Sequence, residues 1–148
     1  MSDDQLAPGL AQVRDEFLEL EQPERLQLLL EYANTLPELP ERYASRPELF
    51  ERVVECQSPV YLFVEVTDDI VTLFATAPKE APTTRGFASI LVRGLSGLHV
   101  AEVLAVPDEF PQMLGLTRAV SPLRLRGMSG MLGRTKHQVK EQVAQAGS

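Results

Sequence analysis

A chain of 148 residues, 44% of them hydrophobic and 24% charged, is long enough for one folded domain with a real core, which argues against wholesale disorder. Its formal net charge of −7 argues against a nucleic-acid partner, because phosphate binding needs a basic surface. The sequence has no run of about 18 apolar residues, so no membrane-spanning helix and no membrane partner are expected.

Charge is distributed unevenly along the chain. Residues 1–51 carry 12 acidic and 4 basic side chains, whereas residues 118–148 carry 1 acidic and 6 basic ones. Two interpretations stay open. Either the basic C-terminal segment docks against the acidic N-terminal helices of the same domain, or it forms a surface of one sign that steers a protein partner.

The N-terminal third predicts two helices and a connector. Residues 8–20 place apolar side chains at helical spacing, and Pro8 suits the first turn of a helix. A second helix is expected over residues 23–36, where prolines end it. Residues 37–49 hold three prolines and several charges, which indicates an ordered connector.

The middle of the chain carries the strand signals. Residues 50–54 are a candidate short strand, and residues 60–66 and 70–75 are rich in β-branched and aromatic side chains. Residues 67–69 between the two longer runs suit a tight hairpin loop. Residues 60–66 are nearly all apolar, so both faces of that strand are expected to be covered.

After a proline-rich turn at residues 77–84, the remaining signals are helical. Helices are expected over residues 85–97, 100–105, 108–115 and 123–146. Helices before and after a compact hairpin predict an α+β fold, in which a compact antiparallel β-sheet is flanked by helices. We expect a single domain over residues 1–148.

Cys56 is the one cysteine of the chain. Strand-like residues lie on both sides of it, while Gln57, Ser58 and Pro59 directly after it favour a turn, so we expect the thiol in a loop between two strands. A lone cysteine cannot form an internal disulfide. Because the acidic N-terminal tetrapeptide also does not resemble a signal peptide, we expect a cytoplasmic protein.

Other kinds of site find little support. The two histidines, His99 and His137, are too far apart in sequence to make a metal site with the cysteine, and the chain has no glycine-rich phosphate loop. The chemistry of Cys56 depends on its thiolate, which Arg124 at the start of the last expected helix could favour and Glu55 could oppose. The residues alone leave Cys56 as a nucleophile, a sulfur carrier or an inert packed side chain.

Three short segments follow one another along the chain. They are Leu36-Pro37-Glu38-Leu39-Pro40, then Cys56-Gln57-Ser58-Pro59-Val60-Tyr61-Leu62, then Leu114-Gly115-Leu116 followed by Val120-Ser121-Pro122-Leu123-Arg124. They resemble the Leu-Pro-x-Leu, Cys-Gln-Ser-x-Val-Trp and Leu-x-Leu…Leu-Ser-Pro-x-Arg motifs of the SufE family. SufE proteins are sulfur acceptors that partner cysteine desulfurases in iron–sulfur cluster assembly. The similarity runs from about residue 10 to residue 140, with short tails at both ends.

The resemblance implies a SufE-like sandwich fold and a sulfur carrier rather than an enzyme. Cys56 is then expected to take sulfur from a cysteine desulfurase as a persulfide, to stimulate that enzyme, and to pass the sulfur to an iron–sulfur scaffold or another acceptor. Arg124 maps onto the family's arginine near the cysteine loop, as a candidate stabiliser of the thiolate or persulfide, and Gln57 and Ser58 map onto loop-shaping positions. No cofactor is expected in this chain, because the pyridoxal phosphate belongs to the desulfurase.

The chain departs from the family at several positions. Pro78 and Lys79 stand in a stretch that is usually acidic, where only Glu80 keeps that character. Tyr61 replaces the family's tryptophan, and Arg126 replaces a small or amide residue. These changes leave the cysteine chemistry intact and alter the surface expected to face a partner.

Two other functions remain open. A one-cysteine enzyme of the peroxidase type needs a thiol of low pKa and an external thiol to resolve the oxidised cysteine. A non-catalytic interaction module needs no reactive thiol at all.

Overall fold

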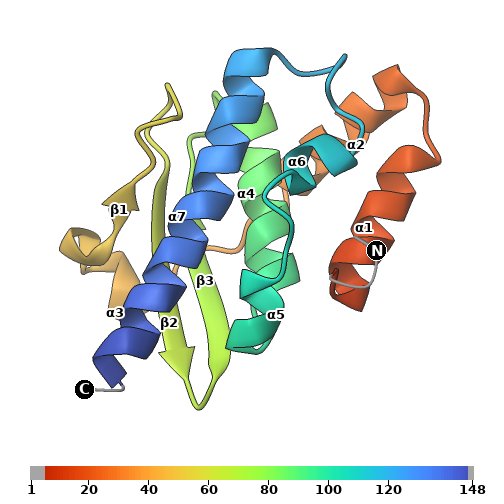
Figure 1. Ribbon diagram of the computed structural model, residues 1–148. Helices are drawn as coiled ribbons and strands as arrows, with labels where there is room; N and C mark the ends of the chain where they lie inside the picture. Colours follow the sequence, from red (N-terminus) through yellow and green to blue (C-terminus); the bar gives the residue numbers. More distant parts are fainter. Residues whose placement is uncertain (1–5, 147–148) are drawn as a thin grey trace.

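The computed structural model describes residues 6–146, so the N-terminal tetrapeptide lies outside the described residues (Figure 1). The helical elements are α1 Pro8–Leu18, α2 Gln22–Ala33, α3 Glu41–Ala44, the 3-10 helix η2 Pro47–Leu49, α4 Pro82–Leu95, α5 Val100–Leu104, α6 Phe110–Met113 and α7 Pro122–Ala146. The strands are β1 Glu51–Arg52, β2 Tyr61–Thr67 and β3 Ile70–Thr76. The predicted α+β class is confirmed.

The strands form one antiparallel sheet in the order β1-β2-β3. Strands β2 and β3 pair along their whole length and end with Thr67 opposite Ile70. The two residues between them, Asp68 and Asp69, have φ angles of 53° and 67°. Two consecutive positive φ values are typical of the type I′ turn, whose twist matches that of paired strands. The predicted hairpin is present.

One face of the sheet is buried and the other is partly covered. Helices α4 and α7 lie on one face (Figure 1). Alternate side chains of β2 and β3 are buried: Leu62, Val64, Val71, Leu73 and Ala75. On the other face, the ring of Tyr43 in α3 lies 5.1 Å from the ring of Phe63 and 4.8 Å from that of Phe74. The apolar sequence of β2 predicted that both faces are covered; the structure buries the first face and covers the second only in part, with Phe63 and Phe74 partly exposed.

Helix α7 is fixed to the edge of β2. Strand β1 has only two residues, so it leaves part of that edge without a partner strand. Two glutamine side chains of α7 bind the edge instead: the N–H of Val64 donates to Gln138 Oε1 (2.8 Å) and the N–H of Val66 to Gln142 Oε1 (2.9 Å). Gln142 Nε2 also donates to the carbonyl of Val64. These bonds set the position of α7, and of every side chain it presents to the cysteine loop.

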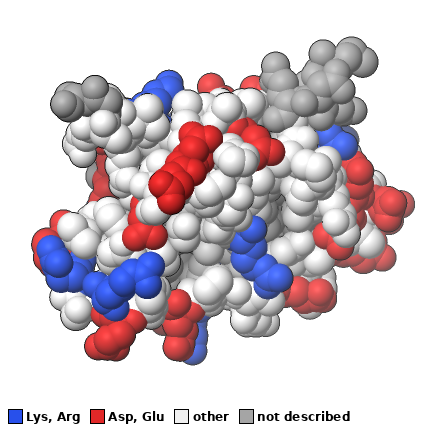
Figure 2. Space-filling model, turned by 90° about the horizontal axis from the view of Figure 1, so that it is seen from below, with Lys and Arg blue, Asp and Glu red and all other residues white. Residues whose placement is uncertain are grey.

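The basic C-terminal segment meets acidic residues from the middle of the chain. In α7, Arg134 pairs with Glu51 and Glu55, and Lys136 pairs with Asp108. None of these acids belongs to α1 or α2, so these pairs do not dock α7 on the N-terminal helices. Seen from the lower end of Figure 1, acidic side chains form several groups, and several of the basic side chains lie next to them (Figure 2).

Some boundaries differ from the expected ones. Helix α4 begins at Pro82, inside the stretch expected to be a turn, because proline fits the first turn of a helix. Helix α2 ends at Ala33. Within residues 6–146, no helix combines the length and the apolar character needed to cross a membrane.

Candidate functional site

Cys56 lies in the loop that joins β1 to β2, at the upper end of the molecule in Figure 1. Backbone hydrogen bonds close this loop: Val53 N–H donates to the carbonyl of Val60 (2.9 Å), and Cys56 N–H donates to that of Val53 (3.0 Å). The loop position was predicted. The burial was not, because the side chain of Cys56 is turned inward and only 7% of the residue is exposed.

The inner side of the loop packs on the first turns of α7. A Cβ atom added at Gly127 would lie 2.9 Å from Cys56 Sγ, and one added at Gly130 would lie 2.7 Å from Glu55 Oε1 and 2.8 Å from Glu55 Cβ. Such distances are too short for a side chain. The two glycines therefore allow the cysteine loop to approach the helix.

A cavity of about 100 Å³ adjoins Cys56. Its other walls come from the loop, from the start of α4 and from α7: Gln57, Ser58, Glu80, Ala81, Thr84, Leu123, Arg124 and Gly127. Pockets for drug-sized ligands usually have at least about 300 Å³. This cavity suits the transfer of a small group at the thiol better than the binding of a whole substrate. A larger hollow of about 350 Å³ beside Tyr43 contains no residue of the predicted site.

The predicted site residues therefore lie together. Gln57, Ser58 and Arg124 line the same cavity as Cys56. Arg124 is exposed; its Nη1 donates to Thr83 Oγ1 (3.4 Å), and its backbone N–H donates to Ser121 Oγ (3.3 Å) at the start of α7. The structure brings the four residues into one place, and their roles stay predictions.

The thiol of Cys56 is protonated at neutral pH. Burial and then the negative charge of Glu55 raise its pKa from 9.0 to about 11, and the cations that oppose this rise are Arg134 and Arg52. Sequence reasoning had singled out neither arginine. Cys56 therefore has to leave its buried position, or its surroundings have to change, before a large fraction becomes thiolate.

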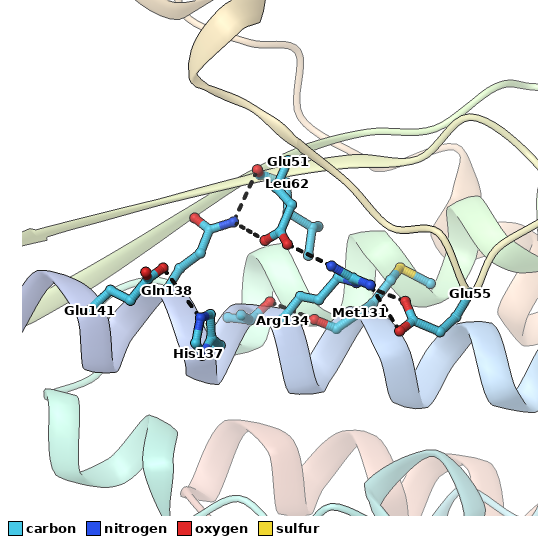
Figure 3. A network of polar contacts seen from close by, with 9 residues as sticks. Glu51, Glu55, Leu62, Met131, Arg134, His137, Gln138 and Glu141 are labelled. Atoms are coloured by element: carbon cyan, nitrogen blue, oxygen red, sulfur yellow. Dashed lines mark hydrogen bonds and ion pairs between the residues drawn. The ribbon is translucent and has the colours of Figure 1, made fainter.

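Arg134 organises a polar network beside the cysteine loop (Figure 3). Its Nε and Nη2 donate to the two carboxylate oxygens of Glu55 (2.7 and 3.0 Å), and its Nη1 donates to Glu51 Oε2 (2.6 Å). The guanidinium lowers the pKa of Glu55 by hydrogen bonding. Gly127, Gly130 and Arg134 are spaced by three and four residues, which places them on one face of a helix. That spacing is the one sequence signal that groups them, and it does not indicate which segment they contact.

Neither histidine belongs to the site. His99 precedes α5 and its Nδ1 lies 3.0 Å from Asp69 Oδ2, while His137 on α7 faces Glu141. Residues 6–146 contain no group of three or more His, Cys, Asp or Glu side chains placed to hold a metal ion.

The residues that depart from the family pattern do not line the cavity. Pro78 is partly buried, and Lys79 and Arg126 are exposed. Glu80, which keeps the family's acidic character, does line the cavity and is placed to act on Cys56.

The fold and the site define a small α+β protein that holds a single cysteine against a helix, beside a cavity. The Fe-S metabolism associated domain of the SufE family matches residues 11–139. Uncharacterized SufE-like proteins of two Mycobacterium tuberculosis strains are 51% identical over 137 residues, covering 92% of this chain and 94% of theirs. The chain belongs to the SufE family.

Two further comparisons match most of the chain. SufE-like protein 1, chloroplastic/mitochondrial, of Arabidopsis thaliana is 28% identical over 87% of this chain, which spans 34% of that longer protein. The solution structure of a hypothetical protein from Thermus thermophilus matches with a TM-score of 0.82 and 37% identity, over 94% of this chain and 98% of that one. The family associates this chain with iron–sulfur metabolism.

Proposed function

We propose that this protein is a sulfur acceptor and carrier for a cysteine desulfurase, with Cys56 as the residue that carries the sulfur. The observation that supports this most directly is the placement of the only cysteine of a SufE-family chain in a loop beside a cavity of about 100 Å³. The chain itself acts as a carrier and activator, not as an enzyme. The lone unpaired cysteine fits the reducing conditions of the cytoplasm.

The transfer is a thiol exchange. The Cys56 thiolate attacks the terminal sulfur of a persulfide on the desulfurase, a new S–S bond forms at Cys56, and the enzyme's S–S bond breaks. The desulfurase cysteine leaves as a thiolate, so no oxidant or reductant is consumed. The pyridoxal phosphate that frees the sulfur from L-cysteine resides on the desulfurase. Cys56 then gives the sulfur to an iron–sulfur scaffold or another acceptor.

The cavity walls can assist this exchange. Arg124, as a cation in the same cavity, balances the charge of the thiolate or persulfide once Cys56 ionises. Gln57 and Ser58 shape the loop, and the carbonyl of Ser58 accepts a hydrogen bond from Val60 N–H (2.9 Å). With a pKa raised to about 11, the resting thiol lacks the low pKa that a peroxidase acting in the free protein needs, whereas a carrier can ionise its thiol at the partner.

The surface next to the cavity offers a face for the desulfurase. Val54 in the loop and Leu123 at the start of α7 are large apolar residues that remain 67% and 43% exposed. Arg124 and Arg126 are exposed beside Leu123. An apolar centre with an adjoining cationic edge fits a partner surface that is apolar and acidic.

Mass spectrometry of the intact protein tests the proposal. After incubation with a cysteine desulfurase and L-cysteine, we expect the wild type to gain the mass of one or more sulfur atoms and to lose it again with a reductant. The Cys56→Ser variant should gain none and should keep the far-UV circular dichroism of the wild type. Full stimulation of the desulfurase by that variant, or no sulfur uptake by the wild type from an active desulfurase, would contradict the carrier role.

A further inference from the structure

We propose that Arg134 is a positioning residue: by holding Glu55 against α7 it keeps Cys56 buried, and a partner releases the thiol by drawing Glu55 away. We call the Glu55–Arg134 ion pair a latch. Its biological meaning rests on the proposed sulfur-carrier function. Its physical claim, that the Glu55–Arg134 pair sets the accessibility of Cys56, concerns the free protein alone.

The contact geometry gives Arg134 control over the loop. Glu55 immediately precedes Cys56, and both of its carboxylate oxygens are bound by one guanidinium, at 2.7 and 3.0 Å (Figure 3). Paired bonds of this kind fix orientation as well as distance. Since Glu55 and Cys56 are neighbours in the chain, fixing the carboxylate of the first restricts the position of the second side chain.

The other end of the latch is anchored in the sheet. Glu51, at the start of β1, accepts from Arg134 Nη1 (2.6 Å) through one oxygen and from Gln138 Nε2 (3.0 Å) through the other. Gln138 is itself bound to the backbone of β2 through Val64 N–H (2.8 Å). Arg134 is thus held from α7, β1 and β2, and Glu55 is the movable partner.

Glu55 is also the only polar side-chain tether of the loop. Among residues 54–59, no other side chain makes a hydrogen bond or an ion pair with any described residue. The remaining support is the loop's own backbone hydrogen bonds and the packing of Cys56 and Glu55 over Gly127 and Gly130. Losing one ion pair therefore frees the whole loop tip from its polar attachment.

The exposure of the pair suits a latch that a partner opens. The side chains of Arg134 and Glu55 are 25% and 33% exposed, so an approaching protein can reach their charges. Half-buried ion pairs stabilise only modestly, and a competing cation for Glu55 can replace Arg134. The partner chemistry that this predicts is an arginine or lysine placed to bind Glu55.

Substituting Arg134 distinguishes its role in holding the loop from a purely electrostatic effect on the thiol. Arg134 lowers the pKa of Cys56, so if it acted by charge alone, Arg134→Gln would raise that pKa and slow alkylation of the thiol. If Arg134 is a latch, the same variant exposes the thiol and alkylation becomes faster. The two explanations predict opposite signs.

The experiment measures the rate at which iodoacetamide, a neutral probe, alkylates Cys56 in the free protein between pH 7 and pH 10. We expect Arg134→Gln to raise the rate about tenfold across this pH range. Arg134→Lys, which keeps the charge without the paired geometry, should give an intermediate rate. An unchanged or slower rate for Arg134→Gln would overturn the proposal.

Two further variants guard the interpretation. Glu55→Gln cuts the latch from the other side and also removes a charge that raises the pKa of Cys56, so both effects should make alkylation faster. Asp108→Asn removes an ion pair that another α7 cation, Lys136, makes away from the loop (2.8 Å), and should leave the rate within about twofold. Unchanged amide exchange at core residues such as Leu132 excludes global unfolding as the route to the thiol.

The result also separates the latch from the proposed function. Faster alkylation of Arg134→Gln in a protein that takes no sulfur from a desulfurase would overturn the carrier role and leave the latch in place. Normal sulfur uptake with unchanged alkylation of the variant would overturn the latch alone.

Discussion

The turns at the two ends of strand β2 are held by different interactions. At one end, Asp68 and Asp69 form a two-residue turn whose positive φ angles and flanking strand pairs are all local. At the other end, the Cys56 loop depends on Arg134, which is 79 residues further along the chain than Glu55. The hairpin turn is held by local contacts alone, whereas the Cys56 loop adds to its own backbone hydrogen bonds an ion pair with a helix that comes later in the sequence.

This difference separates a permanent turn from a releasable one. The hairpin turn can open only if β2 and β3 separate, which means unfolding the sheet. The Cys56 loop can leave α7 when one ion pair breaks and two glycine contacts are lost, while the sheet stays intact. Segments with few stabilising contacts open at the lowest free energy, and functional loops are drawn from them.

Gly130→Ala is the substitution expected to have the largest effect, and it acts on the Cys56 loop and not on the hairpin turn. The added methyl group would lie 2.7 Å from Glu55 Oε1 and 2.8 Å from Glu55 Cβ, so the loop has to shift away from α7. We expect alkylation of Cys56 to become about tenfold faster, as for the loss of the latch, and the free energy of unfolding to fall by about 1–3 kcal/mol from overpacking. Iodoacetamide kinetics and urea denaturation measure the two effects.

Gly133→Ala is the matched control on the same helix. No atom lies within 4 Å of a Cβ added there. The exchange should therefore only improve helix propensity and raise the free energy of unfolding by about 0.5–1 kcal/mol. If Gly133→Ala speeds alkylation as much as Gly130→Ala does, the effect comes from α7 as a whole and not from the contact with Glu55.

The second prediction concerns the pH dependence of the unfolding free energy, and it involves only the Cys56 end of β2. The folded state raises the pKa of Cys56 from 9.0 to about 11, so folding favours the protonated thiol. This contribution to stability is fully present below pH 9 and is lost as the pH rises through 11. We expect the unfolding free energy of the wild type, measured in urea, to fall more between pH 9 and pH 11 than that of Cys56→Ser. Parallel pH curves would mean that the thiol is not buried in solution.

Local chemistry explains which parts of the fold could be predicted. The hairpin, α1, α2 and the long α7 follow from side-chain spacing and turn residues, which act within a few positions. The start of α4 was placed too late because a proline that ends one helix can equally begin another. Strand β1 was expected to be longer, but side chains of α7 take over the edge of β2 beyond its two residues.

Residues near Cys56 in the sequence predict only part of the site. The turn residues Gln57 and Ser58 placed Cys56 in a loop, and the family motif brought Arg124 to the same cavity. Nothing within a few residues of Cys56 indicates that its side chain is buried, because that burial needs the glycine face of α7 to lie beneath the loop. Arg134 was missed for the same reason: its partners come from another part of the sequence.

The smallest effect is expected at the hairpin end, from Asp69→Gly. Asp69 has a φ of 67°, which glycine adopts without the steric cost of a side chain. The exchange removes the exposed contact between Asp69 and His99 (3.0 Å), which contributes little at the surface. We expect the free energy of unfolding to rise by about 0.5–1 kcal/mol in urea denaturation.

A substitution in the hairpin turn should leave the reactivity of Cys56 unchanged. Asp69→Asn, which also loses the charge but keeps a side chain that tolerates positive φ, isolates the contribution of the backbone. Both variants should show the alkylation rate of the wild type at Cys56, because β2 transmits nothing from its hairpin end to the loop while it stays paired with β3. A changed rate in Asp69→Gly alone would show that the two ends are coupled through the strand, and that the loop opens with the sheet and not by itself.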